Sequence, residues 1–479
     1  MPSNRVVLSA AVTRLVPSDL GPLDLDALLV EVDAPRAFPE AALAEAEAAA
    51  RSPRLPALDR TDLPLVTIDP VGSTDLDQAV HVARTDTGYR VSYAIADVGA
   101  FVVPGGALDA EVEQRGVTLY SPDRRVPLHP PVLGERAASL LPDGPRPALL
   151  WQLDLDADGE PTATDVRRAL VRSRAQLDYA GVQRALDDGT APEPLQLLRE
   201  VGRLRQARAR ERGAVDLPTP EQEVVVDGAG RPTLVLRAQL PVERWNASIS
   251  LLTGAAAAAL MLDAEVGLLR TLPPAPEQDV EALRRSAIAL GVDWPGGASY
   301  GAVVSALDPA DPPSAALLVL ATRLLRGAGY TAFDGALPEQ VLHSGVALPY
   351  AHCTAPLRRL ADRHVGEVCL AVAAGEAVPE WARTALPRLP ALMTAATRRA
   401  GALERAVVDA AEALVLEPRV GERFEAVVVE AGDRSGVVQL REPAVRARCE
   451  GADLPLGERL QVELVTADPG RRTVLFRRA

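Results

Sequence analysis

The sequence predicts an α+β protein of several domains, because segments with different hydrophobic periodicities follow one another along its 479 residues. Residues 61 to about 160 contain short, alternating, β-branched runs, which are typical of strands. Long apolar patterns with helical spacing dominate from 242 to 416. Five short strand-like runs then occupy residues 420–479, and this density of strands favours a small barrel such as an OB-fold.

Composition limits the kind of protein. Apolar residues make up 48% of the chain but aromatic residues only 3%, so the core must consist mainly of Ala, Leu and Val. The sequence has no run of eighteen apolar residues and no signal-peptide pattern, so we expect neither a membrane span nor secretion. Three cysteines without zinc-type spacing, Cys353, Cys369 and Cys449, indicate free thiols in a reducing cytoplasm.

Charge is a weaker guide. The net charge of −14 argues mildly against a nucleic-acid partner, although the local field matters more than the sum. All 51 basic residues are arginine, and arginine binds phosphate bidentately and stacks on bases. A GC-rich genome, which favours arginine codons, accounts for the same bias.

The individual elements follow from local pattern. In the first 60 residues, helices are expected at 20–32 and 39–50, with a linker at 51–56. Strands are expected at 65–68, 79–82, 89–96 and 151–156. The pattern from 165 to 212 is helical, and 221–226 with 233–237 predicts a hairpin. Further helices are expected at 242–262, 278–290, 312–328, 354–374 and 391–416, and barrel strands at 423–429, 436–440, 445–449, 459–464 and 473–477.

An acidic segment lies between the first two of the central strands. It contains Asp69, Asp75 and Asp77, followed by Gln78, among Gly, Pro and Ser residues that indicate a tight turn. Carboxylates crowded at the end of a strand repel one another, and a cation removes that cost. Mg²⁺ and Mn²⁺ prefer such oxygen ligands. A solvated surface turn is the alternative, because the same residue types form turns.

A second polar motif is Thr354-Ala-Pro356-Leu-Arg358-Arg359-Leu-Ala-Asp362. A Thr-x-Pro entry places free backbone N–H groups at the start of the expected helix, where they bind anions. The two arginines add positive charge to that first turn. An ordinary capped and solvated helix with basic residues has the same pattern.

Together the two motifs resemble the signatures of the RNase II/RNB family of exoribonucleases, over about residues 61–417. Further blocks match the family in the same order, at 94–98, 104–109 and 119–128. The last segment, 418–479, resembles the S1 RNA-binding domain usually attached to this enzyme. The resemblance implies an RNB catalytic domain, with a mixed sheet wrapped by helices, between a small N-terminal unit at 1–60 and an S1 barrel.

The resemblance also implies a function: hydrolytic, processive degradation of single-stranded RNA from its 3′ end to nucleoside 5′-monophosphates. One or two Mg²⁺ ions, or Mn²⁺, would assist the hydrolysis. By motif position, Asp69, Asp75 and Asp77 would share metal binding and water activation, with Gln78 as a fourth metal ligand. Arg358 would contact the scissile phosphate and stabilise the transition state. The expected partner is RNA with a single-stranded 3′ end, and a monomer is the default state.

Gln78 departs from the family pattern, in which this position is commonly Asp. Its neutral amide oxygen is a weaker ligand than a carboxylate. Three interpretations follow: Gln78 ligates directly or through water, the site binds metal more loosely, or the enzyme is inactive. An inactive RNB scaffold that binds or regulates RNA is therefore the alternative function, and a metal enzyme acting on another phosphoester such as DNA is a third.

Five further residues are predicted from the resemblance to bind RNA: Tyr120, Tyr179, Glu243, Thr354 and Arg359. Tyr120 matches an aromatic residue that stacks on the terminal base and sets the length of the final fragment, although a core tyrosine is the alternative. Tyr179 and Glu243 match positions implicated in sugar recognition, and sensing the 2′-hydroxyl separates RNA from DNA. Arg244 stands where the family has a second glutamate, which weakens that part of the match.

The two ends of the chain carry their own expectations. Family members often have two cold-shock OB domains before the catalytic domain, and residues 1–60 are too few for both. One degenerate domain or a short helical, helix-turn-helix-like unit stands there instead, and this predicts better tolerance of duplexes with short 3′ overhangs. In the barrel segment Phe424 and Phe476 are the only aromatic residues, so we expect arginines to hold RNA by charge and binding to be salt-sensitive.

Overall fold

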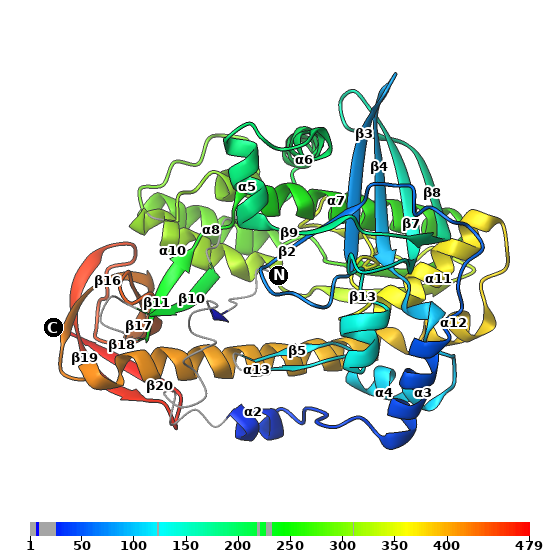
Figure 1. The fold of residues 1–479 in the computed structure, drawn as a ribbon. Helices are drawn as coiled ribbons and strands as arrows, with labels where there is room; N and C mark the ends of the chain where they lie inside the picture. Colours follow the sequence, from blue (N-terminus) through cyan, green and yellow to red (C-terminus); the bar gives the residue numbers. More distant parts are fainter. Residues whose placement is uncertain (1–5, 9–24, 122–123, 218–220, 227–231, 310) are drawn as a thin grey trace.

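The computed structural model describes residues 6–8, 25–121, 124–217, 221–226, 232–309 and 311–479. Its largest sheet has six strands in the order β8-β7-β4-β3-β2-β9 and lies at the opposite end of the molecule from the C-terminal barrel (Figure 1). The sheet is antiparallel except for the parallel pair β2 and β9. Its strands are β2 (Val66–Asp69), β3 (Gln78–Thr85), β4 (Gly88–Ala96), β7 (Arg146–Asp156), β8 (Pro161–Val171) and β9 (Ala175–Asp178).

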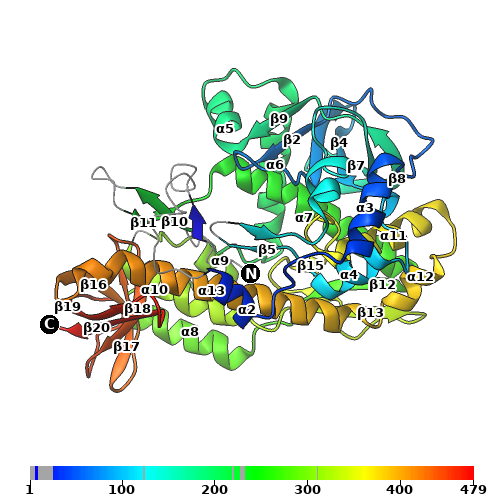
Figure 2. The ribbon, with the colours of Figure 1, turned by 60° about the horizontal axis from the view of Figure 1, so that its bottom comes forward.

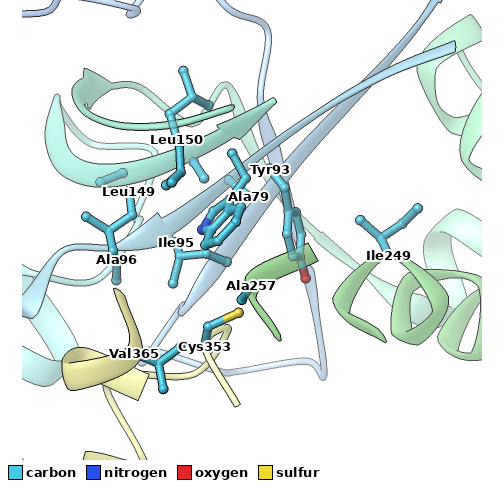
Figure 3. Packing of buried hydrophobic residues seen from close by; sticks show 14 of the residues in the cluster. Ala79, Tyr93, Ile95, Ala96, Leu149, Leu150, Ile249, Ala257, Cys353 and Val365 are labelled. Carbon is cyan, nitrogen blue, oxygen red and sulfur yellow. The ribbon is translucent and has the colours of Figure 1, made fainter. Parts of the chain in front are cut away.

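The main core lies between this sheet and helices α7 (Pro241–Asp263) and α11 (Leu360–Ala374). Figure 3 shows Tyr93 of β4, Leu149 of β7 and Ile249 of α7 among the buried residues of this cluster. Strand β4 is buried along nearly its whole length, because strands flank it on both sides and helices cover the sheet. Residues 89–96, whose alternating apolar pattern predicts a strand, therefore form most of the central strand β4.

Helix α7 is, among the residues that the structure describes, the one helix long and apolar enough by length and composition to cross a bilayer. Within its most apolar window, 61% of the residues are buried inside the protein. A helix in a protein core can be equally long and apolar, because neighbouring elements cover it on most sides and it needs no polar face.

Five strands form the closed C-terminal barrel, with the order β16-β17-β18-β20-β19. They are β16 (Arg423–Glu430), β17 (Ser435–Leu440), β18 (Arg446–Glu450), β19 (Arg459–Asp468) and β20 (Thr473–Arg478). Phe424 and Phe476 are both buried in its interior, with ring centroids 5.9 Å apart in an edge-to-face contact. The predicted small OB-type barrel is confirmed, and its two aromatic residues belong to its core.

The long helix α13 (Leu389–Leu416) joins the two halves of the molecule (Figure 2). It contacts β19 and β20 of the barrel and, elsewhere along its length, the N-terminal helix α2 (Leu25–Glu31). Helix α3 (Glu40–Arg51) packs on α4 (Ala107–Arg115). The helical N-terminal unit is confirmed where it is described; the start of the helix expected at 20–32 and the turn of the hairpin at 227–230 lie outside the described residues.

The remaining elements connect these parts. They are β1 (Val6–Leu8), η1 (Val98–Ala100), β5 (Leu119–Tyr120), β6 (Arg125–Val126), η2 (Leu133–Ala137), α5 (Tyr179–Asp187), α6 (Glu193–Glu211), β10 (Glu221–Val226), β11 (Pro232–Arg237), β12 (Val266–Thr271), α8 (Glu277–Ala289), α9 (Tyr300–Ser305), α10 (Pro312–Ala321), η3 (Thr322–Leu325), β13 (Gly329–Asp334), β14 (Leu342–His343), β15 (Leu348–Pro349), α12 (Glu380–Ala385) and η4 (Glu417–Arg419). Strand β1 pairs in parallel with β10, in a three-stranded sheet with β11.

Two predictions of secondary structure are wrong. The helix expected from 165 is replaced by the end of β8 and by β9, because β8 pairs along its length with β7 and β9 pairs with β2. The helix expected from 354 begins only at Leu360. The pair β12 and β13 was not predicted, since its two strands are separated in sequence by three helices and find each other only in the folded chain.

Candidate active site

The acidic segment connects β2 to β3, and the fold holds it against the second motif. Asp69 ends β2 and Gln78 begins β3. Asp77 is 5% exposed, and its Oδ1 accepts a hydrogen bond from the backbone N–H of Leu357 at 2.8 Å. Nε of Arg358 lies 3.5 Å from the other carboxylate oxygen. Two motifs separated by 280 positions in the chain are therefore in direct contact.

Burial changes the acidity of two carboxyl groups in this segment. Desolvation raises the pKa of Asp69 to about 6 and that of Asp77 to about 8, whereas the positive charge of Arg358 lowers both. The negative charge of Asp75 raises both further. The three carboxylates thus lie within electrostatic range of one another, and a cation would favour their ionised forms.

These residues fit a divalent cation in their donor chemistry. Asp69 and Asp77 offer hard carboxylate oxygens that burial has stripped of water, which suits Mg²⁺. Across the described part of the chain, however, no three His, Cys, Asp or Glu side chains approach closely enough to form a metal cage. Asp75 and Asp77 are instead paired with arginines. The segment therefore supplies ligands for a cation without holding them in a finished coordination sphere.

Arg125, on β6, is a site residue that the sequence reasoning missed. Its Nη1 donates to Oδ1 of Asp75 at 2.5 Å, its Nη2 donates to Thr74 Oγ1, and its Nε lies 3.1 Å from Glu135. The hydroxyl of Tyr120, on the neighbouring strand β5, donates to the other oxygen of Asp75 at 3.5 Å. The position of Arg125 in the same sequence block as Tyr120 was the available signal. The β5–β6 hairpin is therefore fastened to the acidic segment.

Tyr120 is placed as a nucleic-acid contact requires. Its side chain is 44% exposed, which excludes the alternative of a core tyrosine. The hydroxyl end contacts Asp75, so the partly exposed ring is held beside the acidic segment. An exposed, oriented ring is the geometry that base stacking needs.

Residues 354–359, here called the Thr354 segment, are not the first turn of a helix; α11 begins immediately after them. Carboxylates occupy the N–H groups that were expected to bind phosphate. Asp362 accepts from Ala355 at 2.6 Å, and Asp77 accepts from Leu357 at 2.8 Å. The prediction of a helix start with free N–H groups is wrong, because neighbouring carboxylates already bind these groups.

The two arginines of the Thr354 segment have different surroundings. Arg359 donates to both carboxylate oxygens of Asp362 at 2.9 Å, so its guanidinium fork is already engaged. Arg358 faces Asp77 through a longer contact and is 37% exposed. Thr354 itself is 3% exposed, and its hydroxyl lies 2.7 Å from that of Ser250 on α7. Arg358 is therefore the arginine of the pair that is more open to a phosphate.

Gln78 is bound at both ends of its amide group. Nε2 donates to the carbonyl oxygen of Thr354 at 2.6 Å. Oε1 accepts from the hydroxyl of Tyr93 at 2.6 Å. The side chain thus connects β3 to the Thr354 segment and to β4.

Tyr179 lies within electrostatic range of Asp69, and Glu243 lies within electrostatic range of Tyr179. Burial raises the pKa of Tyr179 to about 12, and the charge of Asp69 acts in the same direction. The Tyr179 hydroxyl accepts a hydrogen bond from Asn246 at 3.4 Å. Glu243 accepts from Arg237 at 2.7 Å and from the backbone at the start of α7. The fold thus gathers the residues predicted to recognise the sugar near those predicted to act on the phosphate.

This arrangement suits chemistry on an anionic substrate. Desolvated carboxylates suit a cation, and the partly exposed Arg358 lies 3.5 Å from one of them, Asp77. A phosphodiester held between a cation and an arginine has its negative charge neutralised on two sides, which favours attack by water.

Two parts of the chain match known protein families. Residues 58–372 match the family model "RNB domain". Residues 422–479 match the model "RNase II-type exonuclease C-terminal S1 domain". The first match alone spans more than half of the chain.

Curated relatives agree with these matches. The chain is 31% identical over 322 residues to the exosome complex exonuclease RRP44 homolog A of Arabidopsis thaliana, covering 64% of this chain and 34% of that protein. It is 28% identical over 443 residues to Ribonuclease R of Aquifex aeolicus, covering 88% of this chain and 62% of that protein. The chain therefore spans between about a third and three fifths of the length of these relatives.

Solved structures share the fold at low sequence identity. The apo form of Mycoplasma genitalium RNase R is 19% identical, with a TM-score of 0.83 that covers 95% of this chain and 78% of that one. Yeast Ssd1, described as a pseudonuclease, is 17% identical with a TM-score of 0.68, covering 92% of this chain and 56% of the other. Because the RNB model matches residues 58–372, the chain belongs to the RNB family, and its RNB domain is followed by an S1 domain of the RNase II exonuclease type.

Proposed function

We propose that this chain is a hydrolytic, processive 3′→5′ exoribonuclease that degrades single-stranded RNA to nucleoside 5′-monophosphates. The observation that carries the proposal is the contact of Asp77 with Leu357 and Arg358, since it sets a phosphate-binding arginine beside a cation-binding carboxylate. Relatives named Ribonuclease R and exosome exonuclease RRP44 support the same class of reaction.

The mechanism assigns different tasks to the residues of the site. Asp69, Asp75 and Asp77 would hold Mg²⁺. When bound, Mg²⁺ supplies charge that acidifies water and neutralises the developing negative charge on the phosphate. Arg358 binds the non-bridging phosphate oxygens and stabilises them as their charge grows. The N–H of Leu357 keeps Asp77 oriented beside Arg358.

Residues around the site would hold the RNA itself. Tyr120 stacks on a terminal base, and such stacking is worth ~1–3 kcal/mol. Tyr179 and Glu243 contact the sugar, where the 2′-hydroxyl distinguishes RNA from DNA. Solved RNase R relatives bound to single-stranded and to double-stranded RNA support RNA as the partner.

One experiment separates the candidate functions: incubation of 5′-labelled single-stranded RNA and DNA of the same sequence with the protein and Mg²⁺. A ladder that ends in a short oligonucleotide, with RNA only, is expected. Cleavage of both polymers would assign the chain to phosphodiesterases without a preference for the ribose. Nucleoside monophosphates in the supernatant, identified by mass spectrometry, establish the chemistry of the product.

An RNA-binding protein on an inactive RNB scaffold is the second candidate. The observation that favours it is Gln78, which stands where a fourth carboxylate is expected and whose amide is bound at both ends by protein groups. Yeast Ssd1, described as a pseudonuclease, has the same fold. Uncut RNA with retarded mobility in a native gel is the result that this candidate requires.

A further inference from the structure

We propose that Gln78 is a positioning residue that clamps the Thr354 segment to the sheet, and that it is not a metal ligand. The proposal deepens the proposed nuclease function and rests on it for one readout only, the rate of RNA hydrolysis. Its other readouts, thermal stability and metal binding, do not require the protein to be an active nuclease.

The orientation of the Gln78 amide follows from the chemistry of its neighbours. The carbonyl oxygen of Thr354, 2.6 Å away, can only accept a hydrogen bond, so the NH₂ group of Gln78 must face it. The amide oxygen then faces the hydroxyl of Tyr93, also at 2.6 Å, which donates to it. The Tyr93 hydroxyl occupies one of the two lone pairs of that oxygen, so a metal ion could use only the other, beside the buried Tyr93 and Thr354.

The partners of Gln78 are themselves fixed. Tyr93 is 1% exposed and lies between the sheet and helix α7 (Figure 3). Thr354 is buried, and its hydroxyl lies 2.7 Å from that of Ser250 on α7. One amide therefore joins β3, β4 and the Thr354 segment through two partners that are both shielded from solvent.

Gln78 influences Asp77 and Arg358 because it is covalently linked to the first and hydrogen-bonded to the segment that contains the second. Gln78 follows Asp77 directly, so the two adjacent side chains hold the same segment at two points, the carbonyl of Thr354 and the N–H of Leu357. The next residue of that segment is Arg358. Gln78 thereby fixes the separation of Asp77 from Arg358, the pair on which the proposed chemistry depends.

A carboxylate could not perform this task. An ionised Asp or Glu has no donor for the Thr354 carbonyl and would place negative charge against it. An amide satisfies both neighbours, because it carries a donor and an acceptor. On this view, glutamine at position 78 supplies an interaction that an acidic residue lacks.

The test compares Gln78→Met, Gln78→Glu and Tyr93→Phe with the unchanged protein. Loss of either hydrogen bond is expected to lower the Tm in EDTA by several degrees, and the double variant Gln78→Met/Tyr93→Phe should lose less than the sum. Mn²⁺ affinity, measured calorimetrically without RNA, should change by less than threefold in Gln78→Met and should not tighten in Gln78→Glu. In each of the three single variants, kcat for RNA hydrolysis should fall at least tenfold relative to the unchanged protein, while KM should stay within twofold of its value.

Tyr89→Phe is the matched control. Tyr89 lies four residues before Tyr93 on the same strand, is also buried, and donates its hydroxyl hydrogen bond to Glu200 at 2.6 Å, away from Gln78. Loss of the hydrogen bond between Tyr89 and Glu200 should lower the Tm about as much as Tyr93→Phe does, while kcat stays at the value of the unchanged protein. This comparison separates a loss of positioning from a general loss of stability.

Three results would each overturn the proposal. They are a fall in Mn²⁺ affinity of more than tenfold in Gln78→Met, an unchanged Tm of that variant in EDTA, and a wild-type kcat in Tyr93→Phe. If the unchanged protein cleaves no RNA, the proposed nuclease function fails, whereas the Tm and Mn²⁺ measurements still decide the role of Gln78.

Discussion

Asp77 is a buried side chain that must carry a negative charge in order to bind a cation. Its pKa in the folded protein is about 8, and desolvation is the main cause. The unfolded chain ionises near the usual value of 3.8, so between these pH values the folded state binds more protons than the unfolded state. The free energy of unfolding of the metal-free protein should therefore contain a contribution that decreases as the pH rises from about 4 to about 8.

Substitution of Asp77 by Asn tests this expectation. Asn cannot ionise, yet it still accepts the hydrogen bond from Leu357, so the pH-dependent contribution disappears while the contact remains. In EDTA, the Tm of Asp77→Asn minus that of the unchanged protein should increase by several degrees between pH 5 and pH 8. A difference that is constant over this range would contradict a raised pKa for Asp77.

The expected role of Tyr120 in RNA binding depends on a single side chain, its exposed ring. Replacement by Ala removes stacking worth ~1–3 kcal/mol on one base and leaves the core intact, since the side chain is 44% exposed. The shortest product of RNA degradation, resolved on a denaturing gel, should change in length, whereas Tyr120→Phe should retain the original length. Identical end products for both variants would exclude Tyr120 from setting that length.

At the level of elements, the β5–β6 hairpin is held from two sides. Leu119 and Val126 pack into a hydrophobic cluster with Leu28 and Leu29 of helix α2. On the other side, Arg125 binds the acidic segment through Asp75. The N-terminal unit is therefore a support for the strand that carries Tyr120, in addition to any contact it makes with RNA.

Arg125→Gln tests the second attachment. The variant loses hydrogen bonds between charged groups, each worth ~1.5–3 kcal/mol, and this energy corresponds to about ten- to hundredfold in rate if it serves to hold Asp75 in place. We expect kcat for RNA hydrolysis to fall by at least tenfold.

Arg124→Gln is the control for this variant, because the adjacent arginine pairs with Asp26 in an exposed contact at 3.1 Å. Exposed pairs of this kind contribute about 0–1 kcal/mol, so kcat should change by less than twofold. Equal losses in the two variants would show that charge near the hairpin, and not the bond to Asp75, is responsible.

At the scale of the whole molecule, the barrel should bind RNA mainly by charge. Both of its phenylalanines are in the core, whereas Arg446 and Arg448 are exposed on the same face of β18. The double variant Arg446→Gln/Arg448→Gln should reduce the slope of log Kd against log salt by about 1.4, or ~0.7 for each phosphate that is no longer neutralised.

Arg459→Gln is the matched control for the barrel, because Arg459 is paired with Glu425 at 3.3 Å. Its slope should equal that of the unchanged protein in filter-binding titrations of single-stranded RNA. If the β18 variant also keeps the original slope, RNA does not follow that face of the barrel.

The sequence predicted secondary structure correctly where neighbouring residues alone set it. Helix α7 and the five barrel strands lie close to their predicted positions, since period and turn residues are properties of neighbouring positions. The prediction failed from 165 to 178, where pairing with β7 and β2 decides for strand. It failed again at the Thr354 segment, where Asp77 of the acidic segment binds the Leu357 N–H, Asp362 of α11 binds the Ala355 N–H, and the helix begins only at Leu360.

For the site, the residue types could be predicted from the sequence: three carboxylates in one segment, and a pair of arginines in a second segment that resembles the same family. Which of these groups meet depends on the folded chain. Folding brings Arg358 to Asp77 and Arg125 to Asp75, whereas Arg359 and Asp362 are an i,i+3 pair within one segment. It also engaged both ends of the Gln78 amide. The physical reason is that a hydrogen bond or ion pair depends on distance in space and on burial, and neither is a property of spacing along the chain.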